Sequence, residues 1–249
     1  MLLPLSRTRL RMNEDPVIRP FAAGDRPAVR RIACDTADCG QPVERFFPDR
    51  EIFADLLTRY YTDFEPESSQ VGEQGGVVVG YLNGCLETTR HDHLMKAKVL
   101  PAVLAKTFFR GTWFRPQAMR FVLRNMGVWV SHRYEPPLDL TQYPAHLHVN
   151  LAPDFRGHGL GRMLVETFLN HVADRGVAGV HASVREDNEK GRRFFERLGF
   201  REIAMHPVLR LEKAGGVLYG VLYGLNINGP LPKPEFRNPK YETISKFKI

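Results

Sequence analysis

The chain has 249 residues, of which 43% are hydrophobic and 25% are charged, an ordinary balance for one large globular domain. No apolar stretch is long enough to span a membrane, and the basic opening lacks the apolar core and cleavage site of a secretion signal. The three cysteines, Cys34, Cys39 and Cys85, follow no metal-ligand spacing and are typical of free thiols in a reducing compartment. We therefore expect a cytoplasmic protein without a metal site and exclude a membrane-spanning or disulfide-rich class.

Four elements are expected before residue 62. Residues 1–15 are predicted to form a loose basic arm, and residues 17–20, which open with Val-Ile, a first strand. Helices are predicted over 25–37 and 51–61, because apolar residues recur there at three- and four-residue spacing. Pro27 suits the first turn of the earlier helix, where a missing N–H costs little.

A hairpin is predicted around Asn83-Gly84. Residues 77–82 are rich in valine and favour a strand. Asn-Gly is the strongest short-range signal for a two-residue hairpin turn. Residues 85–88 are therefore expected to pair back on the strand.

Residues 90–136 differ from the rest of the chain in charge. They hold nine Lys or Arg and two acidic residues, a surplus equal to the net charge of +7 for the whole chain. Two apolar runs at helical spacing, Leu94 to Phe108 and Phe121 to Val130, predict two or three helices. One interpretation is a helical insertion with a solvated basic face, and the other is a lid or a cationic acceptor-binding wall that recognises an anionic group. Nucleic acid is disfavoured, since the segment has no run of Lys or Arg and no nucleic-acid motif.

A glycine-rich turn joins a strand to a helix near the middle of the chain. Residues 145–151 alternate apolar and polar side chains, as a half-buried strand does, and apolar residues recur at helical spacing from Met163. Between them, residues 153–162 read Pro-Asp-Phe-Arg-Gly-His-Gly-Leu-Gly-Arg. Glycines let a ligand approach the backbone, and the first N–H groups of a helix are unpaired and face the positive end of its dipole. This turn is therefore a candidate pyrophosphate site.

Three kinds of phosphate loop compete for this turn. A Walker loop needs Gly-Lys-Ser/Thr, whereas Gly161 is followed by Arg-Met. A Rossmann loop needs Gly-x-Gly-x-x-Gly, whereas the glycines here run Gly-x-Gly-x-Gly. The third kind is a coenzyme A loop, with the pattern Arg156-x-x-Gly159-x-Gly161. From the loop alone, a plain glycine turn without a ligand also stays open.

A second motif and two further strands complete the chain. After a predicted strand at 180–184, residues 188–200 read Asn-Glu-Lys-Gly-Arg-Arg-Phe-Phe-Glu-Arg-Leu-Gly-Phe. Strands are predicted at 202–211 and 217–225, joined by a turn at Gly215-Gly216. Residues 229–249 contain four prolines and predict an extended tail, either disordered or packed on a neighbour, so that a homodimer through the tail is one candidate assembly.

The two motifs together resemble the two signatures of the GNAT superfamily of N-acetyltransferases, between residues 143 and 201. The run Pro-Ala-His-Leu-His-Val-Asn at 144–150 also has a weaker resemblance to the acetyltransferase-like domain attached to some O-GlcNAc hydrolases. The resemblance implies an α/β (α+β) GNAT fold, with a mixed, mostly antiparallel central sheet flanked by helices. We expect one GNAT domain over 16–228 with a helical insertion at 90–136, between the basic arm and the proline-rich tail.

The resemblance also implies acetyl-CoA as cofactor and direct attack by an amine. The strand before the loop would pair with the pantetheine arm through its backbone, with the N–H of Val149 or Leu151 facing the thioester carbonyl. The cofactor-binding residues implied in this way are Val149, Asn150, Leu151, Arg156, Gly157, His158, Gly159, Leu160, Gly161, Arg162, Asn188, Phe194 and Phe195.

The catalytic groups depart from the family pattern. Family members often carry a tyrosine where this chain has Phe195, so Tyr219, Tyr223 or a water is the candidate acid, or the thiolate leaves unaided. His146 and His148 are candidate bases because imidazole titrates near neutral pH. In the family register the active-site face carries Tyr143, Ala145 and Leu147, in phase with Val149. Both histidines should then point away from the site, as structural histidines under a helix, unless a bulge shifts the phase.

The predicted function is an acetyl-CoA-dependent N-acetyltransferase that acts on an amine of a small molecule or protein. The acceptor would carry an anionic group if the basic segment faces it, and no membrane partner is expected. The alternative is a catalytically silent acyl-CoA-binding module, which the missing tyrosine favours. A third hypothesis is a cytoplasmic interaction domain that uses the basic segment.

Overall fold

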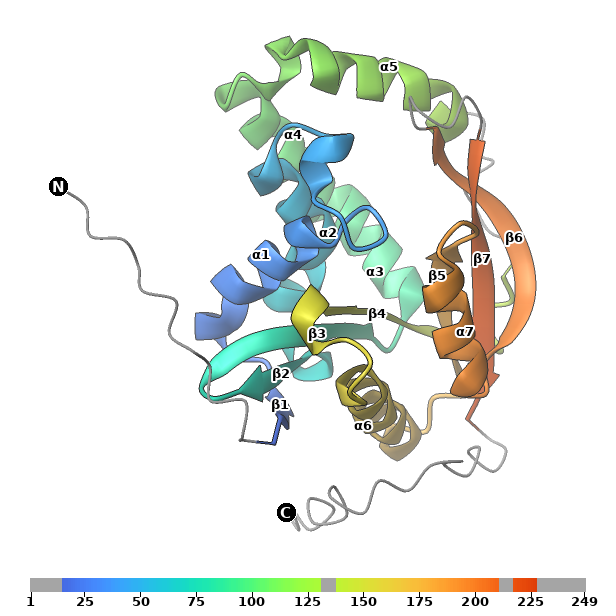
Figure 1. Ribbon diagram of the computed structural model, residues 1–249. Helices are drawn as coiled ribbons and strands as arrows, with labels where there is room; N and C mark the ends of the chain where they lie inside the picture. The colour runs from blue at the N-terminus through green and yellow to red at the C-terminus, as the bar shows by residue number, and fades with distance from the viewer. Residues whose placement is uncertain (1–14, 131–137, 211–216, 228–249) are drawn as a thin grey trace, which may run out of the picture.

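A computed structural model describes residues 15–130, 138–210 and 217–227 (Figure 1). The strands are β1 (Val17–Pro20), β2 (Gln70–Gln74), β3 (Val77–Cys85), β4 (Ala145–Leu151), β5 (Gly179–Arg185), β6 (Arg201–Arg210) and β7 (Val217–Asn226). The α-helices are α1 (Arg26–Asp35), α2 (Arg50–Phe64), α3 (Thr88–Leu94), α4 (Leu100–Phe109), α5 (Pro116–Val130), α6 (Leu160–Asp174) and α7 (Glu189–Arg197). Short 3₁₀ turns lie at Ala23–Asp25, Val43–Arg45, Pro66–Ser68, Thr112–Phe114 and Pro153–Phe155, and a π-turn lies at Met95–Val99.

The strands form one seven-stranded sheet in the order β1-β2-β3-β4-β5-β7-β6. Every neighbouring pair is antiparallel except β4 and β5, which are parallel. The predicted mixed, mostly antiparallel sheet is therefore confirmed, with its parallel pair at the strand before the glycine turn. Figure 1 shows that the β1–β4 half and the β5–β7 half are steeply turned relative to one another.

The hairpin predicted at Asn83-Gly84 is wrong. β3 continues through both residues, and they pair with His148 and Leu147 of β4. The tight turn lies instead at Gly75-Gly76, where both residues have positive φ, and it joins β2, a strand that the sequence analysis missed. Gly84 serves close packing, since a Cβ there would overlap the Phe168 ring and the Ser68 carbonyl oxygen.

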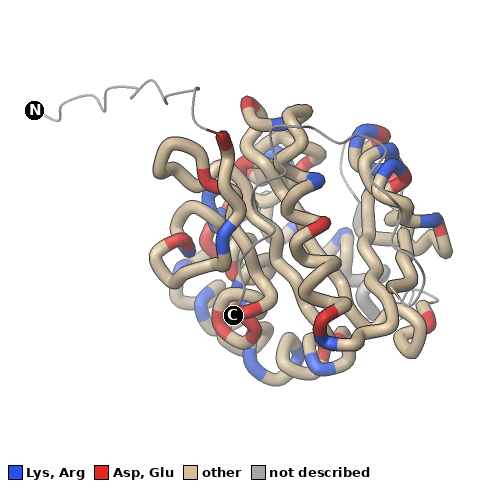
Figure 2. The backbone as a smooth tube through the Cα atoms, turned by 90° about the horizontal axis from the view of Figure 1, so that it is seen from below, with Lys and Arg blue, Asp and Glu red and all other residues tan. Residues whose placement is uncertain are grey.

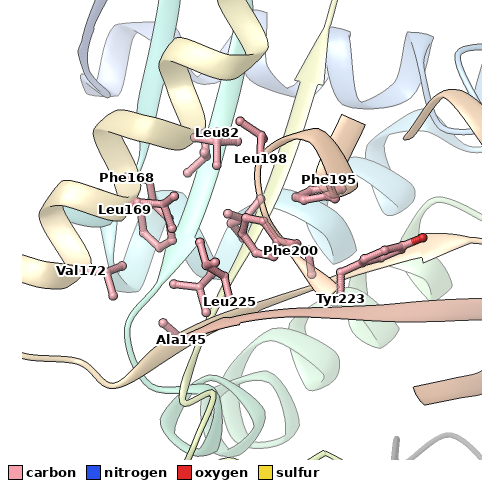
Figure 3. Close-up of a cluster of buried hydrophobic side chains, with 14 of the residues drawn as sticks. Leu82, Ala145, Phe168, Leu169, Val172, Phe195, Leu198, Phe200, Tyr223 and Leu225 are labelled. Atoms are coloured by element: carbon pink, nitrogen blue, oxygen red, sulfur yellow. The ribbon is translucent and has the colours of Figure 1, made fainter. Parts of the chain in front are cut away.

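Two helical layers cover the sheet. On one face, α6 packs through Leu164, Phe168 and Val172 on a core that also contains Leu82 and Ala145 (Figure 3). On the other face lie α1 and α2, which bury a second set of apolar and aromatic side chains against β2 and β3. Because each helix is apolar on one stripe, burial of these stripes from water supplies most of the driving force for the fold.

The predicted helices between β3 and β4 are present as α3, α4 and α5. α4 packs on α2, and α5 reaches across to β6 at the far edge of the sheet (Figure 1). None of the described helices is long and apolar enough to cross a membrane. The predicted arm, the end of the 90–136 segment, the Gly215-Gly216 turn and the tail lie outside the described residues.

Candidate active site

The glycine turn leaves the start of α6 open. Gly157 and Gly159 have φ of 82° and 87°, and a Cβ built on either would meet no atom within 4 Å. Gly159 is the N-cap of α6 and has no side-chain cap. The first backbone bond of the helix is donated by the Met163 N–H, so the N–H groups of Leu160, Gly161 and Arg162 have no partner among the described residues. Unpaired donors at the positive end of a helix suit a phosphate group.

β4 and β5 separate next to this turn. Their pairing is limited to Ala145 with Val180 and His146 with His181. β4 then runs on to Leu151 while it pairs only with β3 on its other side. Apart from the Leu151 carbonyl, which accepts from Arg156, the edge of β4 from Leu147 to Leu151 therefore leaves backbone groups available toward the gap, next to the start of α6. An extended chain that ends in phosphates fits this combination of a free strand edge and a bare helix N-terminus.

The two faces of β4 have different surroundings, and the phase expected for the site needs correction. Ala145 and Leu147 are at most 2% exposed and belong to the core under α6. Their face cannot present side chains to a ligand because α6 covers it. His146, His148 and Asn150 lie on the opposite face, toward α1 and α2.

Histidine and tyrosine side chains gather on this second face at the point where the strands separate. His146 is buried, and its ring nitrogens lie 2.9 Å from the Tyr61 hydroxyl and 2.8 Å from Thr88 Oγ1. The ring centroids of His91 and His181 lie 4.7 and 5.4 Å from that of His146. We call these five residues and His148 the imidazole cluster.

His148 differs from His146 in having free ring nitrogens. Its ring lies 5.7 Å from that of Tyr61, but it makes no hydrogen bond with any described residue. Burial lowers the pKa of His148 to about 4. Burial also lowers the pKa of His146 and of His181, whose Nδ1 donates to the Tyr143 carbonyl at 2.9 Å. All three imidazoles are therefore neutral near pH 7, and His148 is the one whose ring nitrogens are not engaged by a described residue.

Proteins with a similar sequence or fold include several that are named as acetyltransferases. Residues 115–200 match the model of the Acetyltransferase (GNAT) family. The crystal structure of SsHAT is 31% identical with a TM-score of 0.64, and the alignment covers 86% of this chain and 98% of that one. The chain belongs to the GNAT family of acetyltransferases. The structure of yncA from Salmonella typhimurium with its cofactor acetyl-CoA has the same fold, at 17% identity and a TM-score of 0.53 over 86% of this chain and 95% of that one.

Similarity to curated GNAT relatives is local. The mycothiol acetyltransferase of Nocardiopsis dassonvillei is 44% identical over 52 residues, which are 21% of this chain and 16% of that enzyme. The [ribosomal protein bS18]-alanine N-acetyltransferase of Salmonella typhimurium is 38% identical over 55 residues, which are 22% of this chain and 37% of that enzyme. This chain therefore spans well under half the length of these relatives.

The polar side chains of the GNAT loop contact the protein itself. Arg156 donates from Nε and Nη2 to the Leu151 carbonyl, both at 3.0 Å, and so occupies the last acceptor of β4. Arg162 pairs with Glu166 one helical turn on, at 2.7 Å. His158 is exposed in the turn. The loop thus offers mainly its backbone N–H groups to an anion.

The second GNAT motif has mostly structural contacts. Asn188 caps α7, since its side-chain oxygen accepts the Gly191 N–H at 3.1 Å. Phe195, expected to flank the cofactor arm, is 6% exposed and packs edge-on against Phe200 in the core (Figure 3). Phe194 is half-buried and would lie 3.4 Å from a Cβ at Gly161, so of the two phenylalanines it is the one that borders the start of α6.

The two tyrosines considered as acids have different surroundings. Tyr223 is fully buried, and its hydroxyl donates to Glu196 at 2.8 Å and accepts from Arg192 at 3.2 Å. Burial raises the pKa of Tyr223, so this group holds its proton firmly. Tyr219 is 40% exposed and lies across from Pro207 in β6. Neither side chain contacts the imidazole cluster within the part of the chain described here.

The cations of α4 and the turn after it are paired with acids of α2 and with its N-cap residue, Asp49. Lys106 contacts Asp55 at 2.7 Å and Glu51 at 3.2 Å, and Arg110 contacts Asp49 at 3.0 Å. Figure 2 shows acidic and basic positions interspersed along the tube. The surplus computed along the sequence is thus partly cancelled in space, and Lys106 and Arg110 fasten α4 to α2, which weakens the expected cationic wall.

Sequence reasoning missed several members of the imidazole cluster. Tyr61, Thr88, His91 and His181 come from α2, α3 and β5, far apart in the chain. The only local signal was the position of His181 in a strand of alternating polarity, which a core strand shares. No described group of three or more His, Cys, Asp and Glu is arranged to hold a metal ion.

Proposed function

We propose that this GNAT chain is an acetyl-CoA-dependent N-acetyltransferase. The observation that carries the proposal is the free edge of β4 beside the bare N-terminus of α6. The N–H groups of Leu160, Gly161 and Arg162 would hold the pyrophosphate, and the backbone of Val149 and Leu151 would hold the pantetheine arm. Bound acetyl-CoA supplies the acetyl group as a thioester.

His148 is the side chain best placed to take a proton from the acceptor. It lies two residues past the last β4–β5 pair, at the start of the gap. It is neutral near pH 7 and has no hydrogen-bond partner in the described part of the chain, so its lone pair is available. His146 contacts Tyr61 and Thr88 through both ring nitrogens, so its proposed role is to fix the positions of these neighbouring side chains.

The acceptor class follows from the relatives and from the cluster. Mycothiol acetyltransferases and a ribosomal-protein alanine N-acetyltransferase are among the similar proteins by name. Their names support an amine acceptor on a small molecule or a protein. Thr36 Oγ1 and the Tyr81 hydroxyl contact Asn150 at 3.1 and 3.0 Å, which would keep the β4 edge in register for both substrates.

Gly159→Asp tests cofactor binding directly. The substitution places a carboxylate beside the proposed pyrophosphate, so calorimetry should show the loss of acetyl-CoA binding. Gly76→Asp is the matched control, because Gly76 also has positive φ and open space but lies in the β2–β3 turn. If both folded variants bind acetyl-CoA as the wild type does, the coenzyme A site is wrong.

A catalytically silent acyl-CoA-binding module is the second candidate. It is favoured by the burial of Phe195 at the position of the usual tyrosine and by the internal hydrogen bonds of Tyr223. An assay of free thiol released from acetyl-CoA in the presence of a panel of amines distinguishes the transferase from the silent module. The Gly159→Asp variant serves as the background control. Tight cofactor binding without amine-dependent thiol release would favour the silent module.

A further inference from the structure

Asn83 is a buried amide that the protein leaves unused. It is 1% exposed, near the end of β3, and neither Oδ1 nor Nδ2 has a hydrogen-bond partner among the described residues. A buried amide usually makes such bonds, because its desolvation otherwise costs stability. A buried amide without a protein partner is suited to form its hydrogen bonds with a bound ligand or a water molecule.

The partner of Asn83 in the sheet is His148. The two residues face each other across the β3–β4 ladder. Directly opposed residues of an antiparallel pair project to the same face with Cβ atoms about 5 Å apart. The unpaired amide and the unpaired imidazole are therefore neighbours on the face of the imidazole cluster, between Tyr81 and Cys85 of β3.

Among the described residues, the surroundings of this pair contain no carboxylate available for a cation. Glu65 already accepts hydrogen bonds from Tyr60, Ser68 and the Leu86 N–H. Asp92 lies at the surface and binds His91. A charged ammonium would thus lose its hydration without gaining an ion-pair partner, which is costly.

We propose that Asn83 and His148 form the acceptor site and bind the acceptor as a neutral amine, an inference that rests on the proposed function. Asn83 Oδ1 accepts one N–H of the attacking nitrogen and so positions its lone pair. As the bond between nitrogen and the thioester carbonyl carbon forms and the carbon–sulfur bond breaks, His148 takes the other proton. The products are the amide, a thiolate and an imidazolium that returns its proton to solvent.

An acceptor site without a carboxylate partner among the described residues favours one class of amine. A weak base such as His148 removes a proton poorly from an ammonium but readily from an amine nitrogen that is gaining a bond. At pH 7.5 about a third of a peptide α-amine is neutral, against about a thousandth of a lysine ε-amine. Amines of low pKa, such as peptide α-amines and amino sugars, are therefore the expected acceptors.

Asn83→Leu tests the residue. This variant replaces the amide with an apolar side chain of similar size. We expect the Tm of the free protein to stay equal or rise, the acceptor KM to rise about tenfold and acetyl-CoA affinity to stay unchanged. Gln70→Leu is the matched control, because Gln70 has a buried unpartnered Oε1 on β2 but lies two residues from Gly72 on the α6 face. It should leave the KM unchanged.

Two results would overturn the inference for Asn83. One is an unchanged acceptor KM in a folded Asn83→Leu variant. The other is a large fall in the Tm of Asn83→Leu together with an acceptor KM that rises equally in Asn83→Leu and in the Gln70→Leu control. That combination would indicate that the Asn83 amide is structural.

Paired peptides test the acceptor class: one has a free N-terminus and no lysine, the other a blocked N-terminus and one lysine. We expect kcat/KM at least a hundredfold higher for the first, and equal values would overturn the neutral-amine assignment.

A binding measurement separates this inference from the proposed function. The free α-amine peptide is titrated by calorimetry into wild-type and Asn83→Leu protein, each saturated with coenzyme A. Weaker binding to the variant supports the acceptor site even if no amine is turned over, in which case only the transferase proposal fails. Equal binding to both proteins overturns the acceptor site whatever the turnover.

Discussion

Asp38 and Arg185 form an ion pair across the open side of the sheet, with Oδ1 and Nη1 2.6 Å apart. Arg185 ends β5, and Asp38 lies in the loop after α1. Two residues earlier, Thr36 contacts Asn150 of β4. One loop thus contacts both strands at the ends where they have separated.

We expect the Asp38–Arg185 pair to stabilise the protein measurably. The two side chains are 12% and 18% exposed, so a double-mutant cycle with alanine should give a coupling of about 1–2 kcal/mol in urea denaturation. The exposed pair Glu189–Arg193 is the control and should give about 0.5 kcal/mol or less. Equal couplings for the two pairs would contradict the bridging role of the loop.

Lys106 should matter for stability and not for acceptor recognition. Lys106→Met removes the ion pairs to Asp55 and Glu51 and should cost about 1–2 kcal/mol of unfolding free energy. The acceptor KM should not change. Lys96→Met, at an exposed position that forms no ion pair with a described residue, should stay within about 0.5 kcal/mol of the wild type. A raised acceptor KM in Lys106→Met would restore the idea of a cationic wall.

Gly84→Ala should destabilise the fold strongly. A methyl group at this position overlaps the Phe168 ring and the Ser68 carbonyl oxygen, so we expect a loss of about 3 kcal/mol or failure to fold. Gly76→Ala has open space and a positive φ, and should lose only about 1 kcal/mol. Chemical denaturation of both variants measures the difference, and a mild effect at Gly84 would be inconsistent with a continuous β3.

Stability should fall on the acid side of neutrality because of His148. Its folded pKa of about 4 lies below the usual value of 6.5, so between these values the unfolded chain binds more protons and the unfolding free energy rises with pH. The unfolding free energy is therefore not lowered by His148 above pH 6.5, and it decreases as the pH falls from 6.5 toward 4. Between pH 7 and 5 one such group costs about 2 kcal/mol. His148→Gln should therefore lose less stability over this range in urea titrations than the wild type does, and equal losses would show an unperturbed His148.

Local patterns were enough to predict most elements. The helices at α1, α2 and α6 and the strands β1, β6 and β7 follow from hydrophobic period, because an element buried on one face must repeat its apolar residues. The glycine turn before α6 was also predictable, since φ near 85° at Gly157 and Gly159 requires a residue without Cβ. The family resemblance added the mixed, mostly antiparallel sheet flanked by helices, whereas the order of its strands came from the structure.

Tertiary structure decided what period and motif could not. Asn83-Gly84 carries a strong turn signal, yet the ring of Phe168 on a distant helix requires a glycine inside β3. The alternation of β4 was evident, but only the packing of α6 shows which face is covered and which carries His146 and His148. Charge counted along residues 90–136 could not reveal that Lys106 and Arg110 meet acids of α2. Contacts between residues far apart in the chain depend on how elements pack, and no local pattern encodes them.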